Sequence, residues 1–207
     1  AMNSMNNNDS LLLIELEKQY NDYIKAENEA YEKFVREMSN LWGSNNIIES
    51  SQKEWVEYTD NGQSRSKVDF EEGKVTIEII VTPKEAQSDT QVDKKVEDKL
   101  KELLVSRGKT KDYNSAKEKA IDLQDTPILD NQVMTPSGNV VKKETLDRDV
   151  KEIVEDIAIE KKEITGDDGK TRQVVTVKLD LAPDHIRTRA EQYKNEVEKY
   201  CRKYDVD

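Results

Sequence analysis

The sequence predicts an α+β fold in which an antiparallel sheet, made of a meander and a hairpin, is packed by helices. Three short runs with alternating apolar residues follow one another between residues 54 and 82, and two more flank a turn sequence at 166–170. Stretches with helical periodicity precede, separate and follow these runs. Consecutive strands of this kind, set apart from the helices, are typical of α+β domains.

Size and composition predict one globular unit with a modest core. The chain has 207 residues, of which 37% are charged and 34% belong to the hydrophobic set. This balance favours extended helices covered by solvent over a large buried catalytic cavity. The only cysteine, Cys201, lies in a helical pattern and is expected to be a half-buried helix residue without a disulfide partner.

Charge and hydropathy exclude two classes of partner. The 33 basic and 44 acidic residues give a net charge of −11, and no basic stretch is interleaved with aromatic residues, so we expect no nucleic-acid binding. No apolar run approaches the roughly 20 residues that a membrane span needs. Residues 1–9 are small and rich in asparagine, and we expect a flexible leader there.

Residues 10–43 predict one long amphipathic helix, capped by Asp9 or Ser10 and ended by Gly43. Its stripe consists of Leu13, Leu16, Tyr20, Tyr23, Glu27, Ala30, Phe34, Met38 and Leu41. A helix of this length either packs across a whole domain or protrudes as an arm. Its heptad-like stripe suggests an alternative function, in which the helix pairs with a second copy or with another protein.

Residues 44–182 predict the α+β unit itself. The meander is expected at 54–59, 64–70 and 75–82, with Asn61-Gly62 and Gly73 in its turns. Strands at 157–165 and 171–181 are expected to form the hairpin.

Between the meander and the hairpin, the pattern predicts helices at 89–108 and 145–157, the second capped by Thr145. The polar stretch 109–125 suggests a short helix over Ala116, Ala120 and Leu123, and 127–134 a short strand that turns at Thr-Pro-Ser-Gly-Asn. Residues 183–207 predict a closing helix, with Ile186, Ala190, Tyr193, Val197 and Tyr200 at helical spacing.

Three segments resemble one family. They are Tyr-Thr-Asp-Asn-Gly-Gln-Ser-Arg-Ser at 58–66 with the strand that follows to residue 81, the weaker match at 127–141, and residues 179–207, where Pro183 and His185 lead into a helix with Arg189 and Tyr193. In this order they are similar to the amino-terminal domain of membrane-bound lytic murein transglycosylase C. Together they cover about a third of the chain.

The resemblance implies that residues 183–207 lead to a lysozyme-like catalytic domain that is absent from this chain. Members of the family cleave the glycan strands of peptidoglycan without water and leave an anhydro-sugar. The chain is then expected to be a non-catalytic accessory domain that positions or restricts glycan. The resemblance also implies a periplasmic, outer-membrane-anchored lipoprotein, in which the helix 10–43 could instead contact a second copy or another envelope protein.

Six residues are candidates for a glycan or interdomain contact: Trp55, Tyr58, Arg65, His185, Arg189 and Tyr193. Three of them have a structural alternative. Trp55, with Trp42, could anchor the long helix on the sheet, Arg65 could pair with a glutamate across strands, and His185 could hydrogen-bond the first turn of the closing helix.

No catalytic, cofactor-binding or metal-ligating residue is predicted. The resemblance draws attention to Glu49-Ser50-Ser51, because the family's catalytic glutamate lies in a Glu-Ser segment, but here the motif falls between a helix and a strand and no Gly-Leu-Met-Gln segment follows it. The acidic pairs at 71–72, 155–156 and 167–168 fall in turns or on solvated faces. One histidine without a suitable partner makes neither a zinc site nor a catalytic triad.

Overall fold

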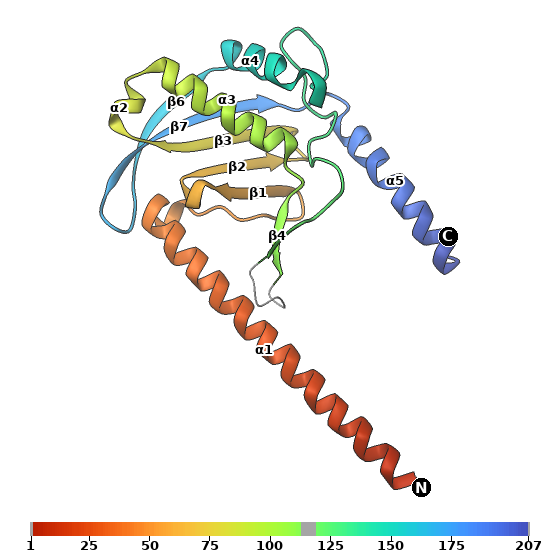
Figure 1. Ribbon diagram of the computed structural model, residues 1–207. Helices are drawn as coiled ribbons and strands as arrows, with labels where there is room; N and C mark the ends of the chain where they lie inside the picture. Colours follow the sequence, from red (N-terminus) through yellow and green to blue (C-terminus); the bar gives the residue numbers. More distant parts are fainter. Residues whose placement is uncertain (1, 113–118, 207) are drawn as a thin grey trace.

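The computed structural model describes residues 2–112 and 119–206 as an α+β domain from which two helices project, α1 (Met2–Trp42) and α5 (His185–Tyr204) (Figure 1). The predicted fold class is confirmed. Five antiparallel strands form the main sheet in the order β1-β2-β3-β7-β6. They are β1 (Glu54–Thr59), β2 (Ser64–Asp69), β3 (Lys74–Val81), β6 (Ile159–Thr165) and β7 (Thr171–Asp180).

The strands lie where the alternating pattern predicts them, with small shifts at their ends. Two glycines fix the turns of the meander. Gly62 and Gly73 have φ angles of 83° and 63°, which residues other than glycine rarely adopt. A Cβ atom on Gly62 would also lie 2.2 Å from Met38 Cε, and one on Gly73 would lie 2.7 Å from His185 Cε1. Both turns therefore serve as contact points for the projecting helices.

One face of the sheet carries the main core. It is covered by α3 (Asp89–Val105) and α4 (Leu146–Asp156) (Figure 1). The buried residues are Val68, Val75, Ile77, Ile79, Val81, Val175 and Val177 from the strands, Val92, Val96, Leu100, Leu103 and Leu104 from α3, and Val150, Ile153 and Val154 from α4. Period two in the strands and helical spacing in α3 and α4 bring these residues together.

The last turns of α1, from Phe34 to Trp42, are called its root here and occupy one end of the opposite face. Met38, Trp42 and Val174 form a second small core there, with Phe34, Tyr58, Ile80 and Ile164 packed around them. Trp42 is fully buried, and its indole N–H donates to the Gly62 carbonyl at 2.7 Å. The rest of α1 extends away from the domain as an arm (Figure 1).

Helix α1 begins at Met2, whereas the sequence analysis expected a flexible leader at 1–9 and a cap at Asp9 or Ser10. The leader contains neither Pro nor Gly, so nothing in it forbids helical backbone. Within residues 2–112 and 119–206, no helix has both the length and the apolar character needed to cross a bilayer.

The helix expected over Ala116, Ala120 and Leu123 is wrong. Ala120 lies in a strand, because β4 (Lys109–Asp112) and β5 (Lys119–Asp122) pair antiparallel, and Leu123 follows that strand. Ala116 lies outside the described residues. Four-residue strands without an apolar stripe give the sequence little periodicity to display.

The strand expected at 127–134 is reduced to single bridges, Val133 to Leu181 and Met134 to Val140. The turn at Thr-Pro-Ser-Gly-Asn is present, with Gly138 N–H donating to the Thr135 carbonyl at 2.9 Å.

Two helices between β3 and β4 also differ from expectation. Helix α3 ends at Val105 before Gly108, and a short helix α2 (Pro83–Ala86) follows β3, held by a capping box between Thr82 and Glu85.

Helix α4 begins after Thr145 as predicted, but the Thr145 side chain does not cap it. Its hydroxyl instead donates to the buried carboxylate of Asp149. Helix α5 follows Asp184, in the region predicted for the closing helix.

Replacing Trp42 by Ala should detach α1 from the sheet. Truncating a fully buried Trp costs about 3–5 kcal/mol of unfolding free energy. We expect a loss of this size for Trp42→Ala in urea unfolding followed by circular dichroism. Leu16→Ala, which is 51% exposed on the arm, should change the unfolding free energy by less than about 0.5 kcal/mol. Equal effects of the two substitutions would contradict this anchoring.

Candidate functional site

The six candidate residues do not meet in one site. Trp55 is half-buried against the main core, on the α3 side of the sheet. Tyr58 and Arg65 lie on the opposite face, beneath the root of α1. The remaining three, His185, Arg189 and Tyr193, lie together at the root of α5. The sequence could not reveal this division, because it depends on which face of the sheet each strand residue occupies.

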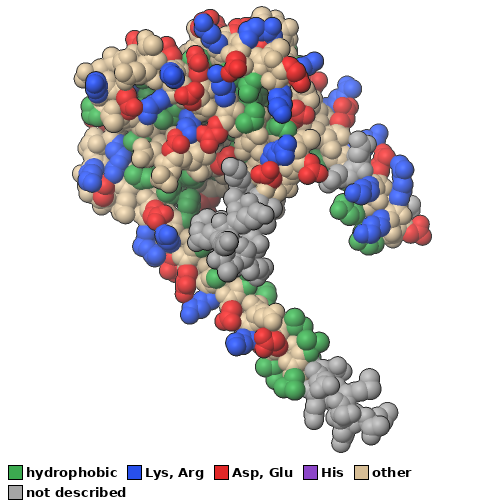
Figure 2. Space-filling model, in the orientation of Figure 1, with side chains coloured by type: hydrophobic (Ala, Val, Ile, Leu, Met, Phe, Trp, Pro, Cys, Tyr) green, Lys and Arg blue, Asp and Glu red, His purple; other side chains and the backbone are tan. Residues whose placement is uncertain are grey.

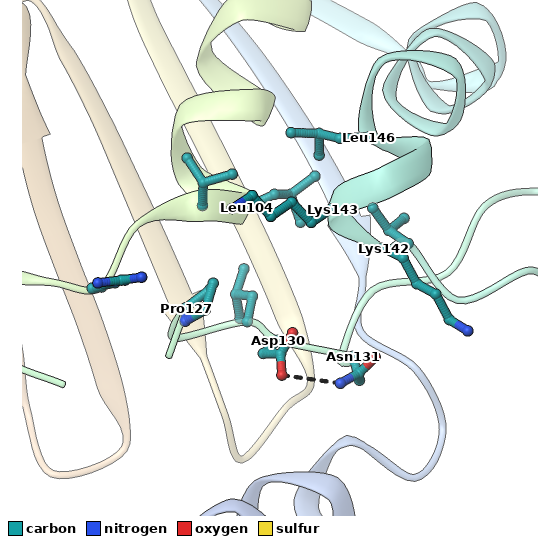
Figure 3. Close-up of a pocket in the computed structure, with 11 residues that line it drawn as sticks. Leu104, Pro127, Asp130, Asn131, Lys142, Lys143 and Leu146 are labelled. Carbon is teal, nitrogen blue, oxygen red and sulfur yellow. Dashed lines mark hydrogen bonds between the residues drawn. The ribbon is translucent and has the colours of Figure 1, made fainter. Parts of the chain in front are cut away.

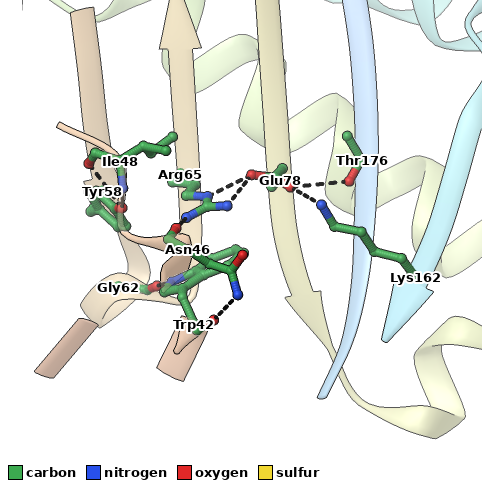
Figure 4. A network of polar contacts seen from close by, with 9 residues as sticks. All are labelled: Trp42, Asn46, Ile48, Tyr58, Gly62, Arg65, Glu78, Lys162 and Thr176. Carbon is green, nitrogen blue, oxygen red and sulfur yellow. Dashed lines mark hydrogen bonds and ion pairs between the residues drawn. The ribbon is translucent and has the colours of Figure 1, made fainter. Parts of the chain in front are cut away.

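Arg65 belongs to a closed polar network (Figure 4). Its Nε lies 2.6 Å from Glu78 Oε2 on the neighbouring strand, and its Nη1 donates to the Asn46 carbonyl. Its guanidinium carbon lies 4.0 Å from the centroid of the Trp42 ring. This is the cross-strand pair with a glutamate that the sequence analysis gave as the alternative for Arg65.

Glu78 is buried at the centre of this network, and Lys162 Nζ lies 2.7 Å from its Oε1. Burial raises the pKa of Glu78, but the hydrogen bond from Lys162 and the charge of Arg65 outweigh it, so the pKa is lowered from its ordinary value of 4.5. A carboxylate held ionised in this way is a structural group. Its Oε2 is taken by Arg65 and its Oε1 by Lys162, so the network holds α1 and three strands together.

Tyr58 is also committed to structure. Its hydroxyl accepts from the Ile48 N–H at 3.0 Å and donates to the Ile48 carbonyl at 3.1 Å. Its ring meets Phe34 of α1 edge to face, with the ring centroids 5.3 Å apart. Tyr58 therefore fixes the loop before β1 and the last turns of α1.

His185 fixes the first turn of α5 to the sheet. Its Nδ1 lies 2.8 Å from the Ala182 carbonyl oxygen, and its Nε2 lies 3.0 Å from the Phe70 carbonyl oxygen. The ring rests directly on Gly73, where no side chain could be accommodated. The alternative given for His185 was a hydrogen bond with the first turn of the closing helix. Its partners are instead the Ala182 carbonyl, just before α5, and the Phe70 carbonyl in the β2–β3 turn.

Arg189 and Tyr193 continue the root of α5 toward the surface. The Arg189 guanidinium carbon lies 3.6 Å from the centroid of the Phe70 ring and 5.6 Å from that of Tyr193. The Tyr193 hydroxyl donates to Gln124 Oε1 at 2.8 Å, and 38% of Tyr193 is exposed. Within the described residues, Arg189 Nη1 and Gln124 Nε2 are buried without a hydrogen-bond partner.

The surface cluster of Phe70, Gln124, Arg189 and Tyr193 is the part of the candidate site that combines aromatic faces with polar groups. Such a combination suits sugar rings and their hydroxyls, and it also suits a contact with another domain. Sequence reasoning missed Phe70 and Gln124. Phe70 follows the last residue of a strand and Gln124 lies in a polar stretch, so neither position carries a signal of its own.

Comparison with known proteins places the chain in a family. The family described as "Membrane-bound lytic murein transglycosylase C, N-terminal domain" matches residues 8–192. The chain belongs to this family.

Three relatives carry the name membrane-bound lytic murein transglycosylase C. The protein from Sodalis glossinidius is 28% identical over 88% of this chain and 51% of its own length. Those from Cronobacter sakazakii and Serratia proteamaculans are 24% and 25% identical, each over 84% of this chain and over 45% and 46% of their own lengths. The chain thus spans about half the length of the curated relatives it matches.

Glu49 is the carboxylate of the Glu-Ser motif named in the sequence analysis. Glu49 is exposed in the loop before β1, where it accepts a hydrogen bond from Tyr31 of α1. This bond raises the pKa of Tyr31. An exposed loop does not provide the apolar cleft that a general acid requires.

The other acidic pairs lie where the sequence analysis expected them. Asp168 in the β6–β7 turn is paired with Arg172 at 2.6 Å, and hydrogen bonds from Arg172 lower its pKa. Among the described residues, no group of three or more His, Cys, Asp or Glu side chains is placed to hold a metal ion.

Glu78→Gln should destabilise the domain in a pH-dependent way. Removing one member of a buried charge network costs about 3–5 kcal/mol of unfolding free energy, because the remaining charges lose their partner. Because the folded pKa of Glu78 is lowered, its contribution is present above its ordinary value of 4.5 and is lost as pH falls through the folded value. The difference between wild type and Glu78→Gln in urea unfolding should therefore be large at neutral pH and smaller under acid conditions.

Glu160→Gln is the matched control, because Glu160 forms an exposed pair with Lys178 at 3.3 Å. Its effect should be small at every pH. A Glu78→Gln penalty that does not shrink with acidification would show that the Glu78 carboxylate is not the stabilising group.

Proposed function

We propose that this chain is the non-catalytic N-terminal domain of a peptidoglycan lytic transglycosylase and that it positions or restricts glycan for a lysozyme-like catalytic domain. The match to a family defined as an N-terminal domain supports this proposal. So do the relatives, which are named as membrane-bound murein transglycosylases and are about twice as long as the matched region. The same names support a location in the cell envelope, where we propose a periplasmic lipoprotein anchored to the outer membrane.

The electrostatics of the buried carboxylates support a non-catalytic role. Cleavage needs a carboxylic acid with a raised pKa that protonates the glycosidic oxygen. Two carboxylates are buried in the described residues, Glu78 and Asp149. Burial raises the pKa of Asp149, but hydrogen bonds from Thr145 and Arg148 outweigh it and lower the value, as the network around Glu78 does. Both groups are held as anions and cannot act as the proton donor at neutral pH.

The observation that carries the positioning role is the way α5 is joined to the sheet. His185 contacts the backbone of Phe70, Arg189 stacks on the Phe70 ring, and Tyr193 and Gln192 bond to the 124–130 segment. Successive turns of α5 are thus fixed to two separate parts of the domain. A helix held in this way sets the direction of whatever follows it, and a rigid direction is what substrate positioning requires.

Breaking α5 beyond its root should separate positioning from folding. Val197 is 58% exposed, and Pro there removes a helix hydrogen bond at a cost of about 3 kcal/mol to the helix. In the full-length protein we expect Val197→Pro to slow the clearing of purified peptidoglycan roughly 3- to 10-fold, because orientation is lost. The assay is turbidity loss, with release of soluble fragments measured by chromatography.

Val197→Ala is the control and should clear peptidoglycan like wild type. The isolated chain should give no clearing, and clearing by the chain alone would overturn the non-catalytic assignment. Unchanged clearing by Val197→Pro, with circular dichroism confirming a broken helix, would overturn the positioning role.

A second function is favoured by the exposed apolar side chains of α1, which include the first three members of its stripe. Leu11, Leu12, Leu13, Ile14, Leu16 and Tyr20 are each at least 51% exposed. Figure 2 shows apolar side chains gathered on the outer part of the arm. A contiguous apolar surface on a helix with heptad-like spacing suits pairing with the same helix of a second copy. This is the interaction module that the sequence analysis gave as the alternative.

Self-association through the arm predicts a change of mass without a change of fold. Wild type at high concentration should sediment above its monomer mass of 23.9 kDa, and Leu13→Asp with Leu16→Asp should return it to the monomer. Asn21→Asp with Asn28→Asp adds the same charge off the stripe and should leave the mass unchanged. Phe34 is unsuitable for this test, because it packs on Tyr58 at the root. Sedimentation of wild type as a monomer at all concentrations would exclude this function.

A further inference from the structure

A small hollow lies on the domain, and none of the six candidate residues lines it (Figure 3). Its volume is about 140 Å³. The end of α3, the turn at 127–131 and the segment at 141–146 form its walls. Leu104, Val105, Pro127, Leu129, Val141 and Leu146 give it an apolar lining.

The size and lining of the hollow suit one apolar side chain. A cavity of about 150 Å³ lined by aliphatic residues can hold a benzene ring, so a volume of this order accommodates a leucyl or phenyl group. Val105 is 45% exposed, which leaves apolar surface open to an incoming group. The lining contains no aromatic residue on which a sugar ring could stack.

The rim of the hollow is basic, although the chain as a whole carries a charge of −11. Arg107, Lys142 and Lys143 line it. Neither lysine makes an ion pair within the described part of the chain, whereas Arg107 forms an exposed ion pair with Asp122, with 3.7 Å between Nη1 and Oδ2. The one carboxylate in the lining, Asp130, accepts a hydrogen bond from Asn131 at 3.0 Å.

Another hollow in the described part of the chain has an acidic lining. Its charged lining residues are Asp89, Asp93, Glu155 and Lys161, and Lys161 pairs with Asp89 at 2.9 Å. Charges within about 10 Å dominate at moderate salt, so the local cations decide what the basic rim attracts, and the distant negative charges are screened. The basic rim is therefore complementary to carboxylates.

We propose that this hollow binds a short acidic peptide, with one apolar side chain in the hollow and its carboxylates against Lys142, Lys143 and Arg107. The 127–131 turn links this site to α5, because Gln192 Nε2 donates to the Asp130 carbonyl at 3.0 Å. The proposal does not depend on glycan positioning, since its ligand is a free peptide and its residues are separate from the cluster around Arg189. Either proposal can fail while the other holds.

The test is a titration of the ¹⁵N-labelled chain with acetyl-Glu-Leu that carries a free terminal carboxylate, followed by NMR. We expect saturable shifts of the amide signals of Leu104, Val105, Asn131 and Leu146. The uncharged analogue acetyl-Gln-Leu-amide should bind roughly 3- to 10-fold more weakly, because it loses the solvent-exposed charge pairs with the basic rim. Raising the salt concentration should weaken the binding of acetyl-Glu-Leu and leave the affinity of the uncharged analogue unchanged.

The double substitution Lys142→Gln with Lys143→Gln should weaken the binding of acetyl-Glu-Leu by a similar factor. Lys151→Gln with Lys178→Gln removes the same charge from exposed positions elsewhere and should leave the affinity unchanged. Four results would overturn the proposal: no saturable shift at these residues, equal binding of the uncharged analogue, equal loss in both double variants, or stronger shifts with a chito-oligosaccharide than with the peptide. All substituted lysines are exposed, and circular dichroism would confirm that each variant folds.

Discussion

The antiparallel pairing of β3 with β7 is the constraint on which the rest of the structure depends. It joins the meander to the hairpin, with Ile77 opposite Val177 at the centre of the sheet. Its register places Val174 beside Ile80 at one end, where α1 is seated, and brings Leu181 beside Gly73 at the other, where the Leu181 N–H donates to the Gly73 carbonyl at 2.7 Å. A slip of one residue would move every side chain to the other face of the sheet. It would remove the packing surface for α1 at one end and for α5 at the other.

The two faces of this strand pair divide stability from contact with the surroundings. The face under α3 and α4 is apolar and supplies the main core. The other face holds the network of Arg65, Glu78 and Lys162, in which each charge is matched at short range. Because these groups satisfy one another, they have little left to offer a ligand. The groups that remain available lie at the edges, on the root of α5 and around the basic hollow.

The sequence predicts the long helices and strands of this domain better than it predicts the short ones. The five strands of the main sheet and the helices at 89–108, 145–157 and 183–207 are long enough for their periodicity to be recognised, and the structure contains each of them with shifted ends, whereas the strand expected at 127–134 is absent. The hairpin of β4 and β5 was missed because four-residue strands display almost no alternation.

The candidate site was predicted only in part, for a different reason. Arg189 and Tyr193 were recognised through the family resemblance and do lie together on α5. Their partners Phe70 and Gln124 come from distant parts of the chain, and so do the walls of the basic hollow. Such assemblies are set by the packing of turns against a helix, which no local pattern encodes. For Arg65 both alternatives stayed open, since a strand arginine has the same sequence signature whether it binds a ligand or a buried glutamate.

The different treatment of the two projecting helices follows from their roots. α1 is held by a small apolar core around Trp42 and then extends alone, whereas the first turns of α5 contact both the β2–β3 turn and the 124–130 segment. Beyond these contacts α5 also becomes bare, since Val197, Tyr200 and Tyr204 are each about half exposed or more. A fixed root with an uncovered outer half is suited to transmit orientation, because an attached body can pack on the outer half while the root resists rotation. The basic hollow shares one connection with this helix, because Asp130 lines the hollow and its carbonyl accepts a hydrogen bond from Gln192.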